Sequence, residues 1–265
     1  MLNVPPVVAL TLLAMAIVHA VRVLLLSPRA NVEFLLLFSF IPARYDATVL
    51  AQGAVPGGLA ADVWTFVTYA FIHGDITHIG LNAVWLLAFG TPVARRFGPW
   101  RFLVFFAVTA AAGAALHLVT HPGDLAPMVG ASAAISGYMA AAIRFVFQGG
   151  GPLEMWRTPE SHAYRVPAAP LSAVLRDPRI LAFLAVWFGL NILFGVGTLA
   201  IAGSEAPIAW QAHIGGFLAG LLLFAAFDPF GNAAPRDEGP DPGAAPDPTR
   251  DPTPNPDPDT EPSVH

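Results

Sequence analysis

Residues 207–227, PIAWQAHIGGFLAGLLLFAAF, decide the class of fold. The segment contains no Asp, Glu, Lys or Arg, and as an α-helix it is about long enough to cross the roughly 30 Å hydrocarbon core of a bilayer. His213 interrupts the apolar run. Because a polar side chain is costly in lipid, it is expected to face protein or a water-filled cavity and to serve a function. The segment therefore predicts a transmembrane helix that carries a functional histidine.

Five more apolar stretches have the length and composition of membrane spans. They are residues 5–26, 78–97, 101–119, 131–148 and 179–199. The whole chain agrees, because 55% of its 265 residues are hydrophobic and only 12% are charged, against about 25% charged in a soluble domain. We predict an all-α membrane protein whose residues 1–227 form one bundle of six transmembrane helices.

Two regions do not fit the pattern of spans. Residues 27–77 include VEFLLLFSFIP and VWTFVTYAFIH, which are apolar but too short to cross, so this first loop is expected to be partly embedded in the membrane. Residues 228–265 hold half of the acidic residues and are rich in proline. With almost nothing apolar to bury, they are predicted to form a disordered cytoplasmic tail.

Composition excludes several classes of function. The chain has no cysteine, which removes disulfides, thiolate zinc sites and a cysteine nucleophile. It has no His-Glu-x-x-His sequence for zinc and no pair of aspartates within the spans. The 13 basic residues, all arginine, are outnumbered by 18 acidic ones, and this balance argues against nucleic acid as a partner.

The distribution of arginine predicts the orientation. The connections 95–101 and 149–178 carry arginines, whereas 120–130 and 200–206 carry none. Positively charged loops stay in the cytoplasm, so the first two are assigned to the cytoplasm and the last two to the outside. With six spans, both termini are cytoplasmic and the protein is a multi-pass protein of the cell (inner) membrane. Residues 27–63 oppose this assignment, since they carry Arg29 and Arg44.

Ser132 is the first candidate catalytic residue. It opens the fourth span, and backbone N–H groups at a helix N-terminus have no intrahelical partner and can hold a developing oxyanion. A serine nucleophile needs a base, which His213 on the sixth span supplies. Two small-residue stripes, Ala133/Gly137/Ala141 and Ala212/Gly216/Gly220, predict close contact between the two helices. The alternative is that these stripes only pack helices and that the Ser132 hydroxyl is satisfied within its own helix.

His78 and Asn82 form a second polar group, one helical turn apart on the second span. Both side chains can donate hydrogen bonds to a substrate carbonyl oxygen; the alternative is a structural hydrogen bond between helices. His73 is expected just outside the same helix. None of the six spans contains Asp or Glu, so a Ser–His dyad, and not a triad with an acid, is predicted.

The combination of His78-xxx-Asn82, Gly130-x-Ser132 and Ala212-His213-xx-Gly216 resembles the rhomboid family of intramembrane serine proteases, over about residues 60–225. The resemblance implies a cavity open to the outside, a half-submerged first loop and a fifth span near a lateral gate. It also implies hydrolysis of peptide bonds in or near the membrane spans of single-pass proteins, without metal or cofactor. Site roles follow from it: Ser132 as nucleophile, His213 as base, His78, Asn82 and the Ser132 N–H as oxyanion hole, and His73, Gly130 and Gly216 as supporting residues.

Three positions depart from the family pattern. Ser136 stands where many relatives place an aromatic residue against the catalytic histidine, and its hydroxyl is expected to hydrogen-bond that histidine instead. Trp64-Thr65 replaces a Trp-Arg pair in the first loop, and Ala94 replaces an acidic residue. These two changes concern structure more than catalysis.

Two other functions remain open at this stage. One is a non-catalytic membrane protein that binds transmembrane segments. The other is a haem-binding cytochrome, since four histidines lie in or near the spans: His19, His78, His117 and His213.

Overall fold

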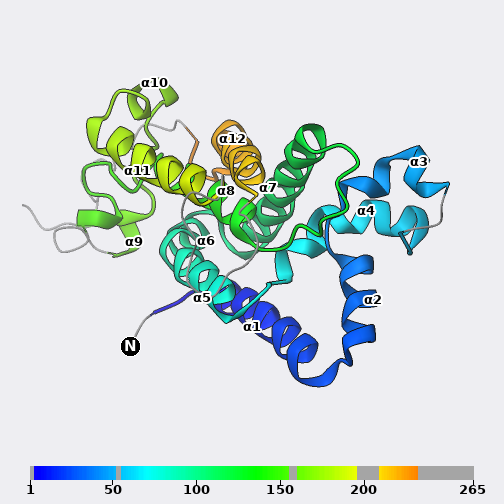
Figure 1. Ribbon diagram of the computed structural model, residues 1–265. Coiled ribbons are helices and arrows are strands. Elements are labelled where there is room, and N and C mark those ends of the chain that lie inside the picture. The colour runs from blue at the N-terminus through cyan, green and yellow to red at the C-terminus, as the bar shows by residue number, and fades with distance from the viewer. Residues whose placement is uncertain (1–2, 52–54, 155–159, 196–208, 232–265) are drawn as a thin grey trace, which may run out of the picture. The chain divides into compact units, whose positions relative to one another are not determined.

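The computed structural model describes residues 3–51, 55–154, 160–195 and 209–231 (Figure 1). These residues belong to one compact unit, Met1–Asn232, and they contain helices and no β-strand. The predicted all-α class is confirmed. The predicted tail lies outside the described residues, apart from 228–231.

Four helical segments among the described residues are long and apolar enough to cross a membrane. They are α1 (Pro6–Ala20) with the π-helical turn η1 (Val21–Leu25); α5 (Ile76–Trp85) continued through η4 (Leu86–Gly90) and α6 (Thr91–Phe97); α7 (Pro99–Thr120); and α12 (Trp210–Phe227). They coincide within about two or three residues with the first, second, third and sixth predicted spans. The chain is thus a helical membrane protein, and the number of six spans remains a prediction.

The fifth predicted span corresponds to α11 (Pro178–Gly195), and its last part, 196–199, lies outside the described residues. Asp177 precedes this helix and accepts a hydrogen bond from the backbone N–H of Arg179 at 2.9 Å. The guanidinium of Arg179 also donates to this carboxylate, which lowers the pKa of Asp177 to about 2. Hydrogen bonds between Asp177 and Arg179, two residues apart, therefore stabilise the N-terminus of α11.

The prediction of a helix over 131–148 is wrong in its last third, residues 143–148. Helix α8 covers only Ser132–Ala142, about 16 Å, and turns follow it. Arg144 explains the change of path, because its backbone carbonyl accepts from the Ala169 N–H at 2.7 Å and its side chain donates to the Ala169 carbonyl at 2.8 Å. Residues 133–142 are all buried, since α8 packs against α7 and α12 (Figure 1). A helix enclosed by protein need not match the thickness of the bilayer.

Small residues bring α8 and α12 together. A Cβ atom added to Gly216 would overlap the backbone of Ala133, 2.7 Å from its carbonyl carbon. A Cβ added to Gly220 would lie 2.6 Å from the Cα atom of Gly137. The two small-residue stripes thus face each other, and glycine at these two positions allows the backbones to touch.

The long first loop is built of short helices: α2 (Pro28–Phe38), η2 (Pro42–Tyr45), α3 (Ala47–Leu50), α4 (Gly58–Thr68) and η3 (Tyr69–Phe71). Arg44 links them, although it is buried. Its guanidinium donates to the carbonyls of Leu36 and Pro56 at 2.5 and 2.8 Å and lies 3.7 Å from the carboxylate of Asp62. Of the two arginines that oppose the predicted orientation, Arg44 is therefore part of the loop's own core, whereas Arg29 is exposed.

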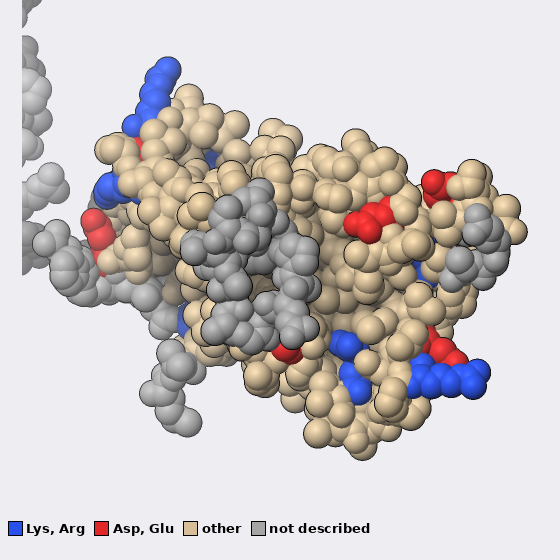
Figure 2. All heavy atoms as spheres, viewed as in Figure 1, with Lys and Arg blue, Asp and Glu red and all other residues tan. Residues whose placement is uncertain are grey.

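A buried ion pair joins α6 to the residue that follows α12. Arg96 on α6 donates to both carboxylate oxygens of Asp228, at 2.9 and 2.8 Å, directly after α12. The third guanidinium nitrogen, Nη1, donates to the backbone carbonyls of Tyr164 and Val166. These two residues lie in the connection between α8 and α11, which holds η5 (Pro152–Glu154), α9 (Glu160–Ala163) and α10 (Leu171–Val174). Most of the surface visible in Figure 2 is uncharged, as expected of a bundle in lipid.

Candidate active site

The loop before α8 is held in place by the first loop. Phe40 and Met128 exchange two backbone hydrogen bonds, at 3.1 and 2.8 Å, and the N–H of Gly130 donates to the Tyr69 carbonyl at 3.0 Å. Gly130 has φ +119°, a conformation that favours glycine, and a Cβ there would lie 2.6 Å from Nε2 of His78. Glycine at this position lets the chain turn into α8 directly beside the His78 ring.

Ser132 and His213 meet at the start of α8. Ser132 is the first residue of the helix, and its Oγ lies 2.6 Å from Nε2 of His213 on α12. His213 is 6% exposed. The first N–H groups of α8 have no intrahelical acceptor and receive no side-chain cap from Ala131. The arrangement therefore puts a hydroxyl, an imidazole nitrogen and backbone donors without an intrahelical acceptor in one place.

His78 and Asn82 lie on α5. Asp75 caps this helix by accepting from the N–H of His78 at 2.8 Å, which fixes the turn that carries the ring next to Gly130. The amide of Asn82 is buried and donates to the backbone carbonyl of His78 at 3.0 Å. One amide hydrogen of Asn82 is thus used within its own helix, and the second is left for another acceptor.

The supporting residues flank this group. The rings of His73 and His78 meet edge to face with centroids 5.1 Å apart. The backbone carbonyl of His73 accepts from Arg22 at 2.8 Å, so the end of the first span is tied to the segment before α5. Gly216 lies one turn after His213 and keeps α12 against α8.

The expectation for Ser136 is wrong. Its hydroxyl donates to the backbone carbonyl of Ser132 at 2.8 Å, not to His213. In the middle of a helix, the carbonyl four residues back is the nearest acceptor for a serine hydroxyl. Asn191, which the sequence analysis did not single out, takes the place beside the histidine: its Oδ1 is hydrogen-bonded to Nδ1 of His213. The sequence did contain a signal for this residue, because Asn191 is a polar residue inside an apolar span.

Comparison with known proteins identifies the family. Residues 60–228, more than half of the chain, match the family model described as the Rhomboid domain. The chain belongs to the rhomboid family. The resemblance drawn from three short motifs is thereby confirmed.

Similar rhomboid proteins come from organisms that are only distantly related to one another. The chain is 31% identical over 169 residues to the RHOMBOID-like protein 12, mitochondrial, of Arabidopsis thaliana. This match covers 61% of this chain and 45% of the Arabidopsis protein. It is 33% identical over 98 residues to the rhomboid protease GluP of Bacillus subtilis (36% and 19% covered). It is 27% identical over 192 residues to the rhomboid protease GlpG of an Enterobacter species (71% and 58% covered). The chain thus spans less than two thirds of the length of these relatives.

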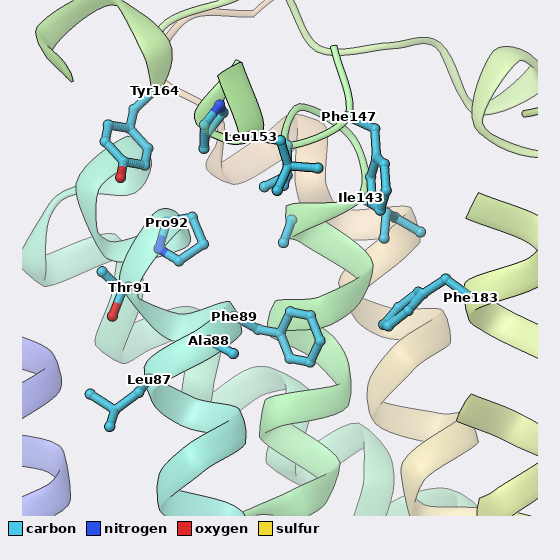
Figure 3. A pocket seen from close by; sticks show the side chains of 13 residues that line it. Leu87, Ala88, Phe89, Thr91, Pro92, Ile143, Phe147, Leu153, Tyr164 and Phe183 are labelled. Atoms are coloured by element: carbon cyan, nitrogen blue, oxygen red, sulfur yellow. The ribbon is translucent and has the colours of Figure 1, made fainter. Parts of the chain in front are cut away.

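Figure 3 shows a pocket of about 340 Å³ in this rhomboid domain, and Ser132 is not among the residues that line it. Its lining is mostly apolar, with Phe89, Ile143 and Phe183 among its side chains. It comes from η4, α6, the end of α8, the turns after α8, η5, the residue after α9, and α11. None of the predicted site residues lines it. The pocket and the Ser132 group are therefore distinct features.

Proposed function

We propose that this rhomboid domain is an intramembrane serine endopeptidase with Ser132 as nucleophile and His213 as general base. The observation that carries the proposal is the 2.6 Å hydrogen bond between Ser132 Oγ and His213 Nε2 at the N-terminus of α8. A nucleophile in hydrogen-bonding contact with a base is the arrangement that serine hydrolysis requires. Two of the relatives named above are themselves named rhomboid proteases.

The reaction proceeds through an acyl-enzyme. His213 Nε2 takes the proton of Ser132 Oγ as the oxygen attacks the scissile carbonyl carbon, and the carbonyl oxygen becomes an oxyanion. When this intermediate collapses, the C–N bond breaks and the imidazolium gives the proton to the leaving amine. A water molecule then attacks the acyl carbon, His213 takes its proton, and that proton returns to Ser132 as the carboxylic acid is released.

The oxyanion is stabilised by donors around the start of α8. The backbone N–H of Ser132 has no intrahelical acceptor, the His78 ring lies beside Gly130, and Asn82 retains one amide hydrogen. Hydrogen bonds from such preorganised donors become stronger as negative charge develops on the carbonyl oxygen. His73, Gly130 and Gly216 support the group by their packing.

The substrates are transmembrane segments of other proteins, and the simplest such substrate is a single-pass protein. A helical peptide bond is protected by its own hydrogen bonds, so the substrate helix must unwind near the site. We assign the protein to the inner membrane, with both termini cytoplasmic and the active site near the outer face, because the loop 120–130 before Ser132 carries no arginine or lysine. Neither metal nor cofactor is needed for this chemistry.

The test is cleavage of a fluorescently labelled transmembrane segment by the full chain in detergent. Ser132→Ala and His213→Ala are expected to abolish cleavage. Ser172→Ala and His162→Ala are matched controls, because both residues are exposed, and these variants should cleave at the wild-type rate. Undiminished cleavage by Ser132→Ala or His213→Ala would falsify the assignment. Binding of the segment without cleavage by the wild-type chain would indicate a binding protein instead.

A further inference from the structure

The second ring nitrogen of the proposed base is also engaged. Nδ1 of His213 is hydrogen-bonded to Oδ1 of Asn191, which lies on α11. We propose that Asn191 is a positioning residue that fixes the tautomer and the ring orientation of His213, so that Nε2 presents its lone pair to Ser132. This inference rests on the proposed function and adds to the Ser–His dyad a third, uncharged member.

The orientation of the Asn191 amide follows from its other contact. Its Nδ2 donates to the backbone carbonyl of Trp187, one turn earlier on α11, at 2.8 Å. A carbonyl can only accept, so the NH₂ group must face it and Oδ1 must face the histidine. Because Oδ1 in turn can only accept, the hydrogen of the neutral imidazole lies on Nδ1. Nε2 is then the acceptor, 2.6 Å from Ser132 Oγ, as a general base requires.

Aromatic packing holds the turn that carries Asn191. Trp187 meets Trp85 of α5 edge to face with ring centroids 4.9 Å apart. Phe188 meets Phe217 of α12 in the same way at 5.1 Å, one turn beyond His213. The acceptor is thus placed by contacts of α11 with both α5 and α12, and its position relative to the imidazole does not depend on the hydrogen bond alone.

An amide suits this position better than a carboxylate. An ionised Asp inside a membrane span carries a large desolvation cost, which accounts for the absence of acidic residues from the predicted spans. The amide oxygen accepts the same hydrogen with a partial charge. It therefore orients the ring and stabilises the imidazolium that forms during acylation without burying a full charge.

Phosphonylation of Ser132 by a fluorophosphonate, with loss of fluoride, tests the inference. Its inactivation rate constant, kinact, reports the chemical step, and its binding constant, KI, reports binding. Asn191→Leu removes the acceptor with little change in volume and is expected to lower kinact about 10–100-fold with KI unchanged. Asn191→Asp keeps an acceptor oxygen and should restore kinact to within about tenfold of wild type. Leu190→Ala, an exposed neighbour on α11, is the matched control and should react like the wild type.

The outcomes separate this inference from the proposed function. If Asn191→Leu reacts at the wild-type rate, or if the Asp variant is as slow as the Leu variant while both melt at the wild-type temperature, the positioning role is overturned. If the wild-type chain does not react at all, the proposed function fails first. Where the Leu variant melts early, Asn191→Ala replaces it. Nitrogen-15 spectra of the histidine side chains give a readout independent of activity: His213 should be protonated at Nδ1 in the wild type, and the Leu variant should show a tautomer mixture.

Discussion

Replacement of Gly216 by alanine is the perturbation for which the structure makes the sharpest prediction. The new Cβ would lie 2.7 Å from the carbonyl carbon and 3.2 Å from the Cα of Ala133. Ordinary contact between carbon atoms begins at about 3.5 Å, so α12 must move away from α8 by about 1 Å. Ser132 precedes Ala133 directly and His213 lies one turn before Gly216, so the same movement lengthens the 2.6 Å hydrogen bond beyond its useful range.

Two quantities should therefore change in Gly216→Ala. A displacement of about 1 Å at reacting groups costs on the order of 100-fold in rate, so fluorophosphonate labelling should slow by about that factor. Overpacking costs about 1–3 kcal/mol, which lowers the melting temperature in detergent by about 2–12 °C. Gly80→Ala is the matched control, because Gly80 is exposed on α5 with no atom within 4 Å of the added Cβ. It should label normally and melt at the same or a slightly higher temperature. Wild-type labelling and melting in Gly216→Ala would refute the close contact of α8 and α12.

Four other variants, one of them a control, test separate features of the site and the fold. Gly130→Ala forces a side chain into φ +119° and against the His78 ring, so fluorophosphonate labelling should fall at least about 100-fold, and normal labelling would contradict the described turn. Asp228→Ala leaves the buried guanidinium of Arg96 unpaired and should cost about 3–5 kcal/mol in thermal unfolding. Glu33→Ala breaks an exposed pair and should cost less than about 1 kcal/mol; equal losses would contradict the difference in burial. Asn82→Ala should slow single-turnover cleavage of a labelled transmembrane segment by about 10²–10³, and an unchanged rate would remove Asn82 from the oxyanion hole.

Length and hydropathy predicted most of the helical framework. Helices α7 and α12 begin and end within about three residues of the predicted spans 101–119 and 207–227. These segments face lipid on part of their surface, so their length and composition must match the bilayer. The end of α8 could not be predicted in this way, because its surroundings are protein and its last turn is set by the pairing of Arg144 with Ala169. That contact joins residues 25 apart in sequence and leaves no local pattern.

The candidate site was predictable where a polar residue lies at a helix terminus or beside a small-residue stripe. Ser132 and His213 meet both conditions, and the structure places them in contact. Ser136 was misassigned because the acceptor within its own helix is nearer than the histidine. Asn191 was missed because the motifs directed attention to the second, fourth and sixth spans. The energetic cost of a polar side chain in an apolar helix applies equally to the fifth span, and it could have identified Asn191.

The most direct test of the central claim is to locate the covalent adduct after reaction of the wild-type chain with a fluorophosphonate. Mass spectrometry should find one phosphonyl group per chain, on the peptide that contains Ser132, and His213→Ala should prevent its formation while the variant still melts cooperatively. An adduct on a different serine, or equal labelling of the His213 variant, would contradict the claim that this hydroxyl and this imidazole act together.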